Sequence, residues 1–310
     1  MKLTLEQLKT ITFGAVHVYN DPEGVTHWQR MTNAQVDAYG VHAAILAERA
    51  MATTGCRLDF MTDSDHLVVQ SASGGKYEIL VNGLFAEMLQ DIGRICITLP
   101  QGENRVSILL PDHDPGTLSL VKLDEGATFT PYRYDHKFLF LGDSITQGWE
   151  SSRPSTSYVN HLGSFFHAQI TNWGVGGSFF EANTLAPVDF TPDKVFFAYG
   201  TNDYTHWQSR AEFEAACDAY MARVKALFPH CPVYCISPIW RQDGLISNRA
   251  GTHVQVRDYL IRCAESYGFI HVDGYTLVPH HSDYYADKFL HPNDLGFAVY
   301  AQNLIKAIQK

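Results

Sequence analysis

The sequence predicts a chain of two parts, in which an all-β sandwich precedes an α/β part with a parallel sheet. The first observation is that short alternating or apolar runs, each closed by turn residues, follow one another from about residue 54 to residue 124. This spacing is typical of β-sandwiches. The second observation is that apolar runs of about five residues alternate with helical segments from about residue 138 onward. That alternation is typical of a parallel sheet with helices on both faces.

The composition indicates a globular protein and argues against two classes of partner. Of the 310 residues, 45% are hydrophobic and 13% are aromatic, which suffices for a buried core. A formal net charge of −10 and a pI near 5.8 argue against a nucleic-acid partner, which would need a basic surface. The first ten residues, MKLTLEQLKT, do not resemble a signal peptide, and no long uncharged apolar run follows. We therefore expect a soluble cytoplasmic protein without a membrane partner, in an oligomeric state that the sequence leaves open.

Cysteine and histidine spacing predicts neither a disulfide framework nor a metal site. The cysteines form no CxxC pair, and we expect all of them to be reduced thiols in the core; they are Cys56, Cys96, Cys217, Cys231, Cys235 and Cys263. His280 and His281 are adjacent, and no third ligand stands at a metal-site spacing, so we expect a polar loop there.

The first part contains the signals of about eight strands. Asn82-Gly83 separates two of the apolar runs, and this dipeptide accepts the positive φ angles of a two-residue hairpin. An earlier segment, TNAQVDAYGVHAAILAERAM, predicts a helix capped by Asn33, although Gly40 interrupts it. The runs are CRLDFMT, HLVVQ, KYEILV, LFAEML, RICITL, RVSILL and TLSLVKL. We expect a jelly-roll-like sandwich over residues 1–135.

The second part, residues 136–310, begins where the strand rhythm changes, just after Pro131. Its helical segments carry apolar residues at three- and four-residue spacing; Phe213, Ala216, Tyr220, Val224 and Leu227 form one such stripe, which we interpret as core. The alternation favours a five-stranded flavodoxin-like sheet. Its predicted strands are Phe138 to Leu141, Gln169 to Trp173, Val195 to Tyr199, Val233 to Ile236 and Phe269 to Val272.

Three chemistry-bearing segments fall on what would be one rim of this sheet. Ser144 in LFLGDSITQGWE follows the first strand, where the alternative is a serine that only caps a helix. Asn202 and Asp203 in FFAYGTND follow the third strand, and His291 in ADKFLHPNDLG precedes the last helix. Because the carboxyl ends of parallel strands share one edge, we expect these residues to meet there.

In this order the segments GDSITQG, NWGVGG, GTND and DKFLHPND resemble the four sequence blocks of the SGNH (GDSL-type) hydrolases, over roughly residues 137 to 305. The resemblance implies a flavodoxin-like fold and a serine ester hydrolase that needs neither metal nor cofactor. Carried over residue by residue, it implies that Ser144 is the nucleophile, His291 the base and Asp287 the acid that orients it. It also implies an oxyanion hole formed by Ser144, Gly177 and Asn202.

Two departures from the family pattern leave alternatives open. The family usually places the aspartate three residues before the histidine, whereas Asp287 stands four residues before His291 and Lys288 takes the expected place. Four residues is one helical turn, so contact is expected, with Asp283 or a backbone carbonyl as the alternatives. In the glycine block, the spacing from Asn172 indicates Gly177, with Gly174 and Gly176 as alternatives.

The predicted sandwich over residues 1–135 indicates a class of substrate. A β-sandwich before an SGNH domain resembles the family 2 carbohydrate esterases, which implies a small-molecule acyl ester, most simply an acetylated sugar or glycoside. Trp240 and Arg241 follow the fourth strand and are candidate substrate-binding residues, with packing as the alternative. The other functions that we consider are an acyltransferase, a lipid or thioester hydrolase on the same residues, and a non-catalytic carbohydrate-binding protein with a vestigial site.

Overall fold

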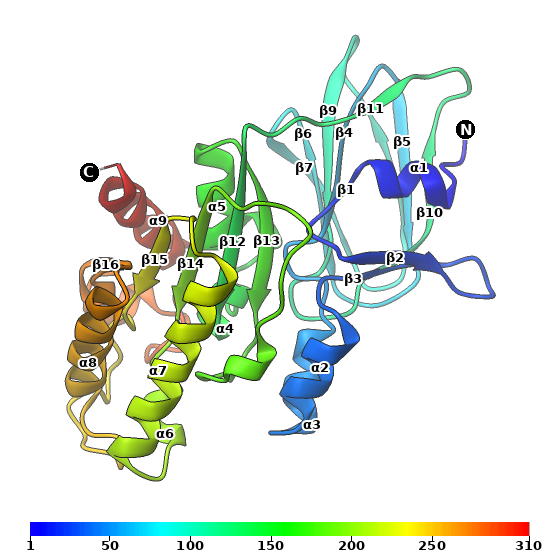
Figure 1. Cartoon of the computed structure of the whole chain (residues 1–310). Coiled ribbons are helices and arrows are strands. Elements are labelled where there is room, and N and C mark those ends of the chain that lie inside the picture. Colours follow the sequence, from blue (N-terminus) through cyan, green and yellow to red (C-terminus); the bar gives the residue numbers. More distant parts are fainter. Residues whose placement is uncertain (310) are drawn as a thin grey trace.

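A computed structural model describes residues 1–309 as two antiparallel sheets followed by one parallel sheet with helices (Figure 1). The antiparallel sheets lie on the right of the view and the parallel sheet on the left, with the described ends of the chain at opposite sides. This arrangement confirms the predicted fold class.

The two antiparallel sheets pack face to face and enclose a core of their own, which includes Phe60, Tyr77, Val106 and Ile108. In the first sheet the order is β1-β4-β9-β6-β7, with β11 paired to β4; in the second it is β2-β3-β10-β5-β8. The strands are β1 (Thr12–Phe13), β2 (His17–Asn20), β3 (Thr26–Gln29), β4 (Arg57–Thr62), β5 (His66–Ser71), β6 (Lys76–Val81), β7 (Leu84–Gln90), β8 (Arg94–Thr98), β9 (Asn104–Leu109), β10 (Thr117–Leu123) and β11 (Phe129–Pro131).

The predicted hairpin is present between β6 and β7. Asn82 has a φ of 52° and Gly83 a φ of 79°, as a two-residue turn of this kind requires. The strand number exceeds the expected eight because β1, β2 and β3 precede the region of regular spacing. β1 spans only two residues, and β2 is exposed at three of its four positions, so neither carries the alternation that marks a half-buried strand.

The predicted helix after β3 is two helices, α2 (Asn33–Gly40) and α3 (Ala44–Ala50). The expectation that Asn33 caps it was wrong: Thr32 is the N-cap, in a capping box with Gln35, and a threonine followed three residues later by glutamine is a signature of this box. Although α2 and α3 belong to the first part of the sequence, Tyr39, Leu46 and Ala50 pack into the core beside the parallel sheet. A short helix, α1 (Leu5–Thr10), precedes the sandwich.

The parallel sheet has the order β13-β12-β14-β15-β16, which confirms the flavodoxin-like prediction. The first strand, β12, lies between β13 and β14, so segments that follow these strands meet at one edge. The strands are β12 (His136–Gly142), β13 (Ala168–Gly174), β14 (Lys194–Ala198), β15 (Val233–Ile236) and β16 (Ile270–Val272).

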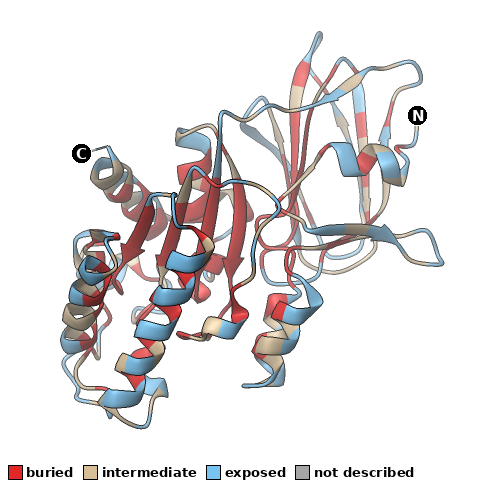
Figure 2. Cartoon of the chain, viewed as in Figure 1, coloured by how far each residue is buried: buried red, intermediate tan, exposed pale blue. Residues whose placement is uncertain are grey.

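Helices cover both faces of this sheet because its strands are apolar on both sides (Figure 2). Phe138 and Phe140 of β12 contact the core under α5 (Tyr158–Phe165) and α9 (Asp294–Ile308), whereas Leu139 and Leu141 contact the core under α7 (Arg210–Leu227) and α8 (His253–Ser266). The predicted stripe on α7 packs against that second core. Four single 3₁₀ turns complete the described elements: Pro154–Thr156, Ala182–Thr184, Gly274–Thr276 and Ser282–Tyr284.

All six cysteines are free thiols, and four of them are buried. Cys96 is exposed on β8 and Cys231 is partly exposed, so the expectation that all six lie in the core was wrong for these two. Within residues 1–309, no helix combines the length and the apolar character needed to cross a membrane. The expected cytoplasmic location stays a prediction.

Arg30 joins the first part of the chain to the parallel sheet. Its side chain is 1% exposed and donates to the carbonyls of Asn172 (2.8 Å) and Gly174 (2.7 Å) at the end of β13. It also donates to the carbonyls of Arg49 (2.9 Å) and Ala52 (2.7 Å) at the end of α3. Burial lowers the pKa of Arg30 to about 10, so the guanidinium is charged at neutral pH and binds carbonyl dipoles on both sides of the junction.

We predict that Arg30→Met destabilises the protein by about 2 to 4 kcal/mol, because buried carbonyls lose a charged donor. Urea unfolding followed by circular dichroism measures this change. Arg94→Met, at an exposed arginine of β8, is the control and should change the free energy of unfolding by less than about 0.5 kcal/mol. Equal stability of the Arg30 and Arg94 variants would contradict the assigned role of Arg30.

Candidate active site

Ser144 begins the short helix α4 (Ser144–Gln147) directly after β12. The N-cap is Asp143, whose Oδ1 accepts a hydrogen bond from the amide of Ile145 at 3.0 Å. The alternative that Ser144 merely caps the helix is therefore wrong, and its hydroxyl is available for another partner. Gly142 is needed at the turn, because a Cβ there would lie 2.1 Å from Thr146 Oγ1.

Ser144, His291 and Asp287 form one chain of hydrogen bonds. Ser144 Oγ lies 2.9 Å from His291 Nε2, and His291 Nδ1 lies 2.8 Å from Asp287 Oδ2. The hydroxyl is nearly buried, at 5% residue exposure, whereas the imidazole is 21% exposed. The structure therefore brings together three residues from two segments that are far apart in the sequence.

Asp287 reaches His291 through a turn and not through the expected helical turn. Its Oδ1 accepts from the amides of Phe289 (2.9 Å), Leu290 (2.8 Å) and His291 (3.1 Å). Lys288, the extra residue, adopts a φ of 60°, in the left-handed region that compresses the chain locally. Burial opposes ionisation of Asp287, but the hydrogen bonds from Leu290, from the His291 side chain and from Phe289 outweigh it and lower its pKa.

Asp283, the alternative acid, lies elsewhere. Its carboxylate is exposed and 3.6 Å from His281, and its backbone carbonyl accepts from Asn293. No hydrogen bond joins it to His291 within residues 1–309.

The hydrogen bonds of the glycine block differ among its three candidate amides. Gly174 N donates to Asn172 Oδ1 at 2.8 Å, and Gly176 N donates to Gln147 Oε1 at 2.6 Å. Gly177 is partly exposed, has a φ of 82°, and its amide has no acceptor within the described chain. Of the three, only the Gly177 amide is available to a ligand.

Asn202 lies beside this block, just before α6 (Asp203–His206). Its Nδ2 donates to the carbonyl of Ser178 at 2.8 Å, which engages one of its two amide hydrogens. Asp203 is buried and accepts from the amides of Phe180 (3.0 Å) and Gly200 (3.1 Å). Burial raises the pKa of Asp203 to about 6. Asp203 thus ties the loop after β14 to the segment that follows the glycine block.

Three side chains near Ser144 were not predicted. The Trp149 ring lies 6.2 Å from the His291 ring and 5.2 Å from the His113 ring, centre to centre. The Arg49 guanidinium lies 4.7 Å above the indole. Trp149 directly follows GDSITQG, so its position in the sequence could have indicated that it lies near the serine. Arg49 and His113 come from the first part of the chain, and no local pattern there indicates a site.

Trp240 and Arg241 have structural partners around the site. The Trp240 ring stacks on the ring of His280, with 5.7 Å between their centres. Arg241 is 7% exposed, donates to the carbonyl of Thr201 at 2.8 Å, and forms an ion pair with Asp243. Because Thr201 precedes Asn202, Arg241 supports the loop that carries Asn202.

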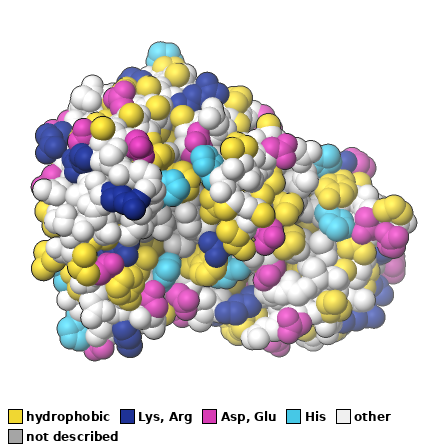
Figure 3. Space-filling model, turned by 90° about the horizontal axis from the view of Figure 1, so that it is seen from below, with side chains coloured by type: hydrophobic (Ala, Val, Ile, Leu, Met, Phe, Trp, Pro, Cys, Tyr) yellow, Lys and Arg dark blue, Asp and Glu magenta, His cyan; other side chains and the backbone are white. Residues whose placement is uncertain are grey.

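These residues meet at the carboxyl-end edge of the sheet, where α4 and α6 lie below β12 and β14 in Figure 1. Figure 3 looks onto this side and shows histidine and hydrophobic side chains along the middle of the face. Within residues 1–309, no three His, Cys, Asp or Glu side chains are grouped as a metal site. A serine hydrogen-bonded to a histidine that is in turn bonded to a carboxylate is the arrangement of a serine hydrolase.

Comparison with known proteins places the chain in a family. Residues 140–299 match the model of the GDSL-like Lipase/Acylhydrolase family, and the chain belongs to this family. It is an ester-hydrolysing enzyme of the SGNH fold, as the resemblance of its four sequence blocks implied. A search of curated protein sequences gave no significant match.

Solved structures share the whole two-part architecture. The salicylyl-acyltransferase SsfX3 from a tetracycline biosynthetic pathway is 20% identical with a TM-score of 0.86, over 100% of this chain and 96% of that one. A family two carbohydrate esterase from Cellvibrio japonicus is 15% identical with a TM-score of 0.69, over 100% and 98% of the two chains. The acetyl xylan esterase Est2A from Butyrivibrio proteoclasticus is 14% identical with a TM-score of 0.58, over 82% and 89%. At these identities the likeness shows the fold.

We predict that the stabilising effect of the Asp287 charge disappears at low pH. Because the pKa of Asp287 is lowered in the folded protein, its contribution is complete above the ordinary carboxyl value near 4 and is lost as the pH falls through the lowered value. Asp287→Asn keeps an acceptor for the amides and removes the charge. The Tm of this variant should lie below that of the wild type at pH 6, and the difference should shrink as the pH is lowered below about 4; a constant difference would contradict the prediction.

Proposed function

We propose that this protein hydrolyses small acyl esters through an acyl-enzyme on Ser144. The observation that carries the proposal is the hydrogen-bonded series from Ser144 Oγ through both nitrogens of His291 to Asp287, at 2.9 and 2.8 Å. A serine hydroxyl is a weak nucleophile at neutral pH and requires a base within hydrogen-bond reach. Asp287 fixes the imidazole so that Nδ1 carries a proton and Nε2 accepts one.

In the first half-reaction, Ser144 Oγ attacks the acyl carbon and its proton passes to His291 Nε2. The tetrahedral intermediate then collapses, the bond to the alcohol oxygen breaks, and His291 returns the proton to the departing alcohol. In the second half-reaction, water attacks the acyl carbon and gives a proton to His291 Nε2. The bond between the acyl carbon and Ser144 Oγ then breaks, His291 returns the proton to Ser144 Oγ, and the carboxylic acid is released. Asp287 stays ionised throughout, in line with its lowered pKa.

In this proposal three donors bind the oxyanion. The amide of Ser144 is the first of α4 and has no acceptor within the helix. The amide of Gly177 is unengaged within the described chain, which supports Gly177 over Gly174 and Gly176. The second amide hydrogen of Asn202 Nδ2 supplies the third donor. Such donors stabilise the transition state more than the ground state.

We predict that Ser144→Ala lowers p-nitrophenyl acetate hydrolysis by several orders of magnitude and leaves the unfolding curve nearly unchanged, since only one hydroxyl is lost. A fluorophosphonate probe should label the native wild type and should label neither the variant nor the heat-unfolded protein. Retention of a tenth of the activity in the variant would remove Ser144 from this role. Equal labelling of native and unfolded wild type would favour a vestigial site in a carbohydrate-binding protein.

The proposed substrate is an acetyl ester of a sugar or glycoside. A cavity of about 340 Å³ lies between the lower end of the sandwich and the segment after α4. Its wall combines hydrogen-bond donors and acceptors with apolar surface that includes Pro111 and Pro154; the polar side chains are Lys76, Gln90, Asp91, His113, Asp114, Ser151 and Arg153. A polyhydroxylated alcohol is the class of ligand that such a wall can hydrogen-bond.

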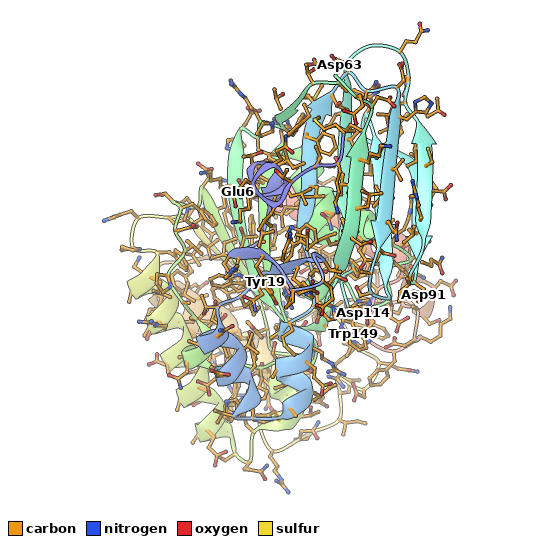
Figure 4. The ribbon with its side chains drawn as sticks, turned by 90° about the vertical axis from the view of Figure 1, so that its right-hand side faces the viewer. Glu6, Tyr19, Asp63, Asp91, Asp114 and Trp149 are labelled. Carbon is orange, nitrogen blue, oxygen red and sulfur yellow. The ribbon has the colours of Figure 1, made fainter. Side chains whose placement is uncertain are left out.

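Two aromatic rings, those of His113 and Trp149, connect the cavity to His291. His113, in its wall, contacts Trp149, and Trp149 contacts His291. Figure 4 shows Asp91 and Asp114 at the end of the sandwich that lies near Trp149, with Asp63 at the opposite end. In this proposal the acetyl group lies at Ser144, and the sugar extends past Trp149 toward the cavity. In this proposal residues 1–135 supply one wall and residues 136–310 supply the chemistry, which is the domain division that we propose.

We predict that Asp91→Asn combined with Asp114→Ala raises KM for an acetylated sugar by about three- to tenfold, because the acceptor at residue 114 is lost and the acceptor at residue 91 loses its charge. Hydrolysis of p-nitrophenyl acetate, which has no such hydroxyls, should not change. Asp65→Ala, at an exposed carboxylate two residues from Asp63, is the control and should change neither rate. A wild type that cleaves aryl acetates and none of a panel of acetylated sugars would exclude this substrate class.

Acyl transfer to an alcohol is the second candidate function, and one observation favours it. The acyltransferase SsfX3 covers the full length of this chain with a TM-score of 0.86. The two functions share the acyl-enzyme and differ in whether water or an alcohol attacks it. Product analysis with an added sugar acceptor separates them: an acyl sugar indicates transfer, and free acetate alone indicates hydrolysis. Longer acyl esters and thioesters in the same assay test the lipid-type and thioester hydrolase alternatives.

A further inference from the structure

The peptide bond between Gly176 and Gly177 carries the amide that we assign to the oxyanion hole. In a trans peptide the carbonyl and the N–H point in opposite directions within one plane. The direction of the Gly177 N–H is therefore set by what holds the Gly176 carbonyl. A glycine on each side gives this peptide unusual freedom to rotate, because neither residue has a Cβ that restricts φ and ψ.

Arg49 holds that carbonyl. Its Nη1 donates to Gly176 O at 2.8 Å, and a Cβ on Gly177 would lie only 2.9 Å from the same nitrogen. Within residues 1–309, no carboxylate lies within salt-bridge distance of Arg49. Its charge is therefore not neutralised by a partner and acts on the carbonyl, in a charge-assisted hydrogen bond.

The position of Arg49 is fixed from two sides. Its backbone carbonyl, at the end of α3, accepts from Arg30 Nη2 at 2.9 Å, and its guanidinium lies 4.7 Å above Trp149. The other side of the same glycine is also held, since Gly176 N donates to Gln147 Oε1 at 2.6 Å. Gln147 is the last residue of α4, the helix that begins with Ser144. Gly176 is thus held at its carbonyl by α3 of the first part and at its amide by α4 of the second.

We propose that Arg49 is a positioning residue for oxyanion stabilisation. By binding the Gly176 carbonyl it holds the 176–177 peptide in the one orientation that directs the Gly177 N–H toward the reacting carbonyl oxygen. Its positive charge at the carbonyl end also polarises the amide and strengthens the donor. This inference rests on the proposed function and adds to it a residue from outside the family's matched region, residues 140–299.

The role can be distinguished from simple packing because it acts on the transition state. Loss of an oxyanion donor typically costs about 100- to 1000-fold in turnover, and a donor that is present but misdirected should cost less. For Arg49→Met we expect kcat for p-nitrophenyl acetate to fall by about 10- to 100-fold, with KM changed by less than about twofold. Arg49→Lys keeps the positive charge but lacks the planar guanidinium group. It should therefore recover part of the lost kcat.

The experiment compares these variants with Arg262→Met, at an exposed arginine of α8, which removes the same charge away from the site. Active sites are counted with the fluorophosphonate probe so that kcat refers to folded protein. Binding of a methyl trifluoromethyl ketone, which forms a charged tetrahedral adduct on serine, should weaken by the same factor as kcat/KM in Arg49→Met and stay unchanged in Arg262→Met.

Parallel losses in kcat/KM and adduct affinity, with partial rescue by lysine, would support the proposal. Full kcat per labelled site in Arg49→Met, or unchanged ketone affinity, would overturn it and leave Arg49 a packing residue. These outcomes differ from failure of the proposed function itself, in which the wild type would neither hydrolyse the ester nor react with the probe.

Discussion

The architecture depends on a buried arginine, Arg30, at the junction of its two parts. Arg30 binds four backbone carbonyls, two at the end of α3 and two at the end of β13. A buried charge without a carboxylate partner is costly unless dipoles replace the lost water, and here carbonyls do so. Because Gly174 begins the glycine block, the same interaction that joins the sandwich to the sheet also fixes the start of the loop beside Ser144.

The site is assembled from segments whose positions follow from the strand order. β12 lies in the centre with β13 and β14 on its two sides, so the turns after all three strands adjoin. These turns carry the serine, the glycine block and Asn202, whereas His291 arrives from the segment before α9. Around this set Arg241, Asp203 and Gln147 each hold a loop by its backbone, which leaves the reactive groups free for a substrate.

Much of the second part could be predicted, because strands buried on both faces are continuous apolar runs and helices follow at regular intervals. Ser144 and Asn202 were expected at one edge because they follow parallel strands, and His291 was expected there because it precedes the last helix. The contact between Asp287 and His291 was expected from a helical turn, whereas the structure forms it through a turn in which Lys288 has a left-handed backbone conformation. Residue spacing alone does not indicate that conformation. The proposed preference for Gly177 over Gly174 and Gly176 required knowing which amides already have acceptors. Arg30 and Arg49 act across the junction, and no local pattern marks such residues.

The packing of α2 and α3 limits how the two parts of the chain can recombine during evolution. These helices precede most of the sandwich in the sequence, yet their buried side chains pack into the core beside the parallel sheet, and α3 carries the arginine that contacts the glycine loop. A recombination event at the apparent border would therefore separate Arg30 and Arg49 from the backbone they bind. The front segment cannot be exchanged between relatives as an independent module, and the two halves are constrained to evolve together.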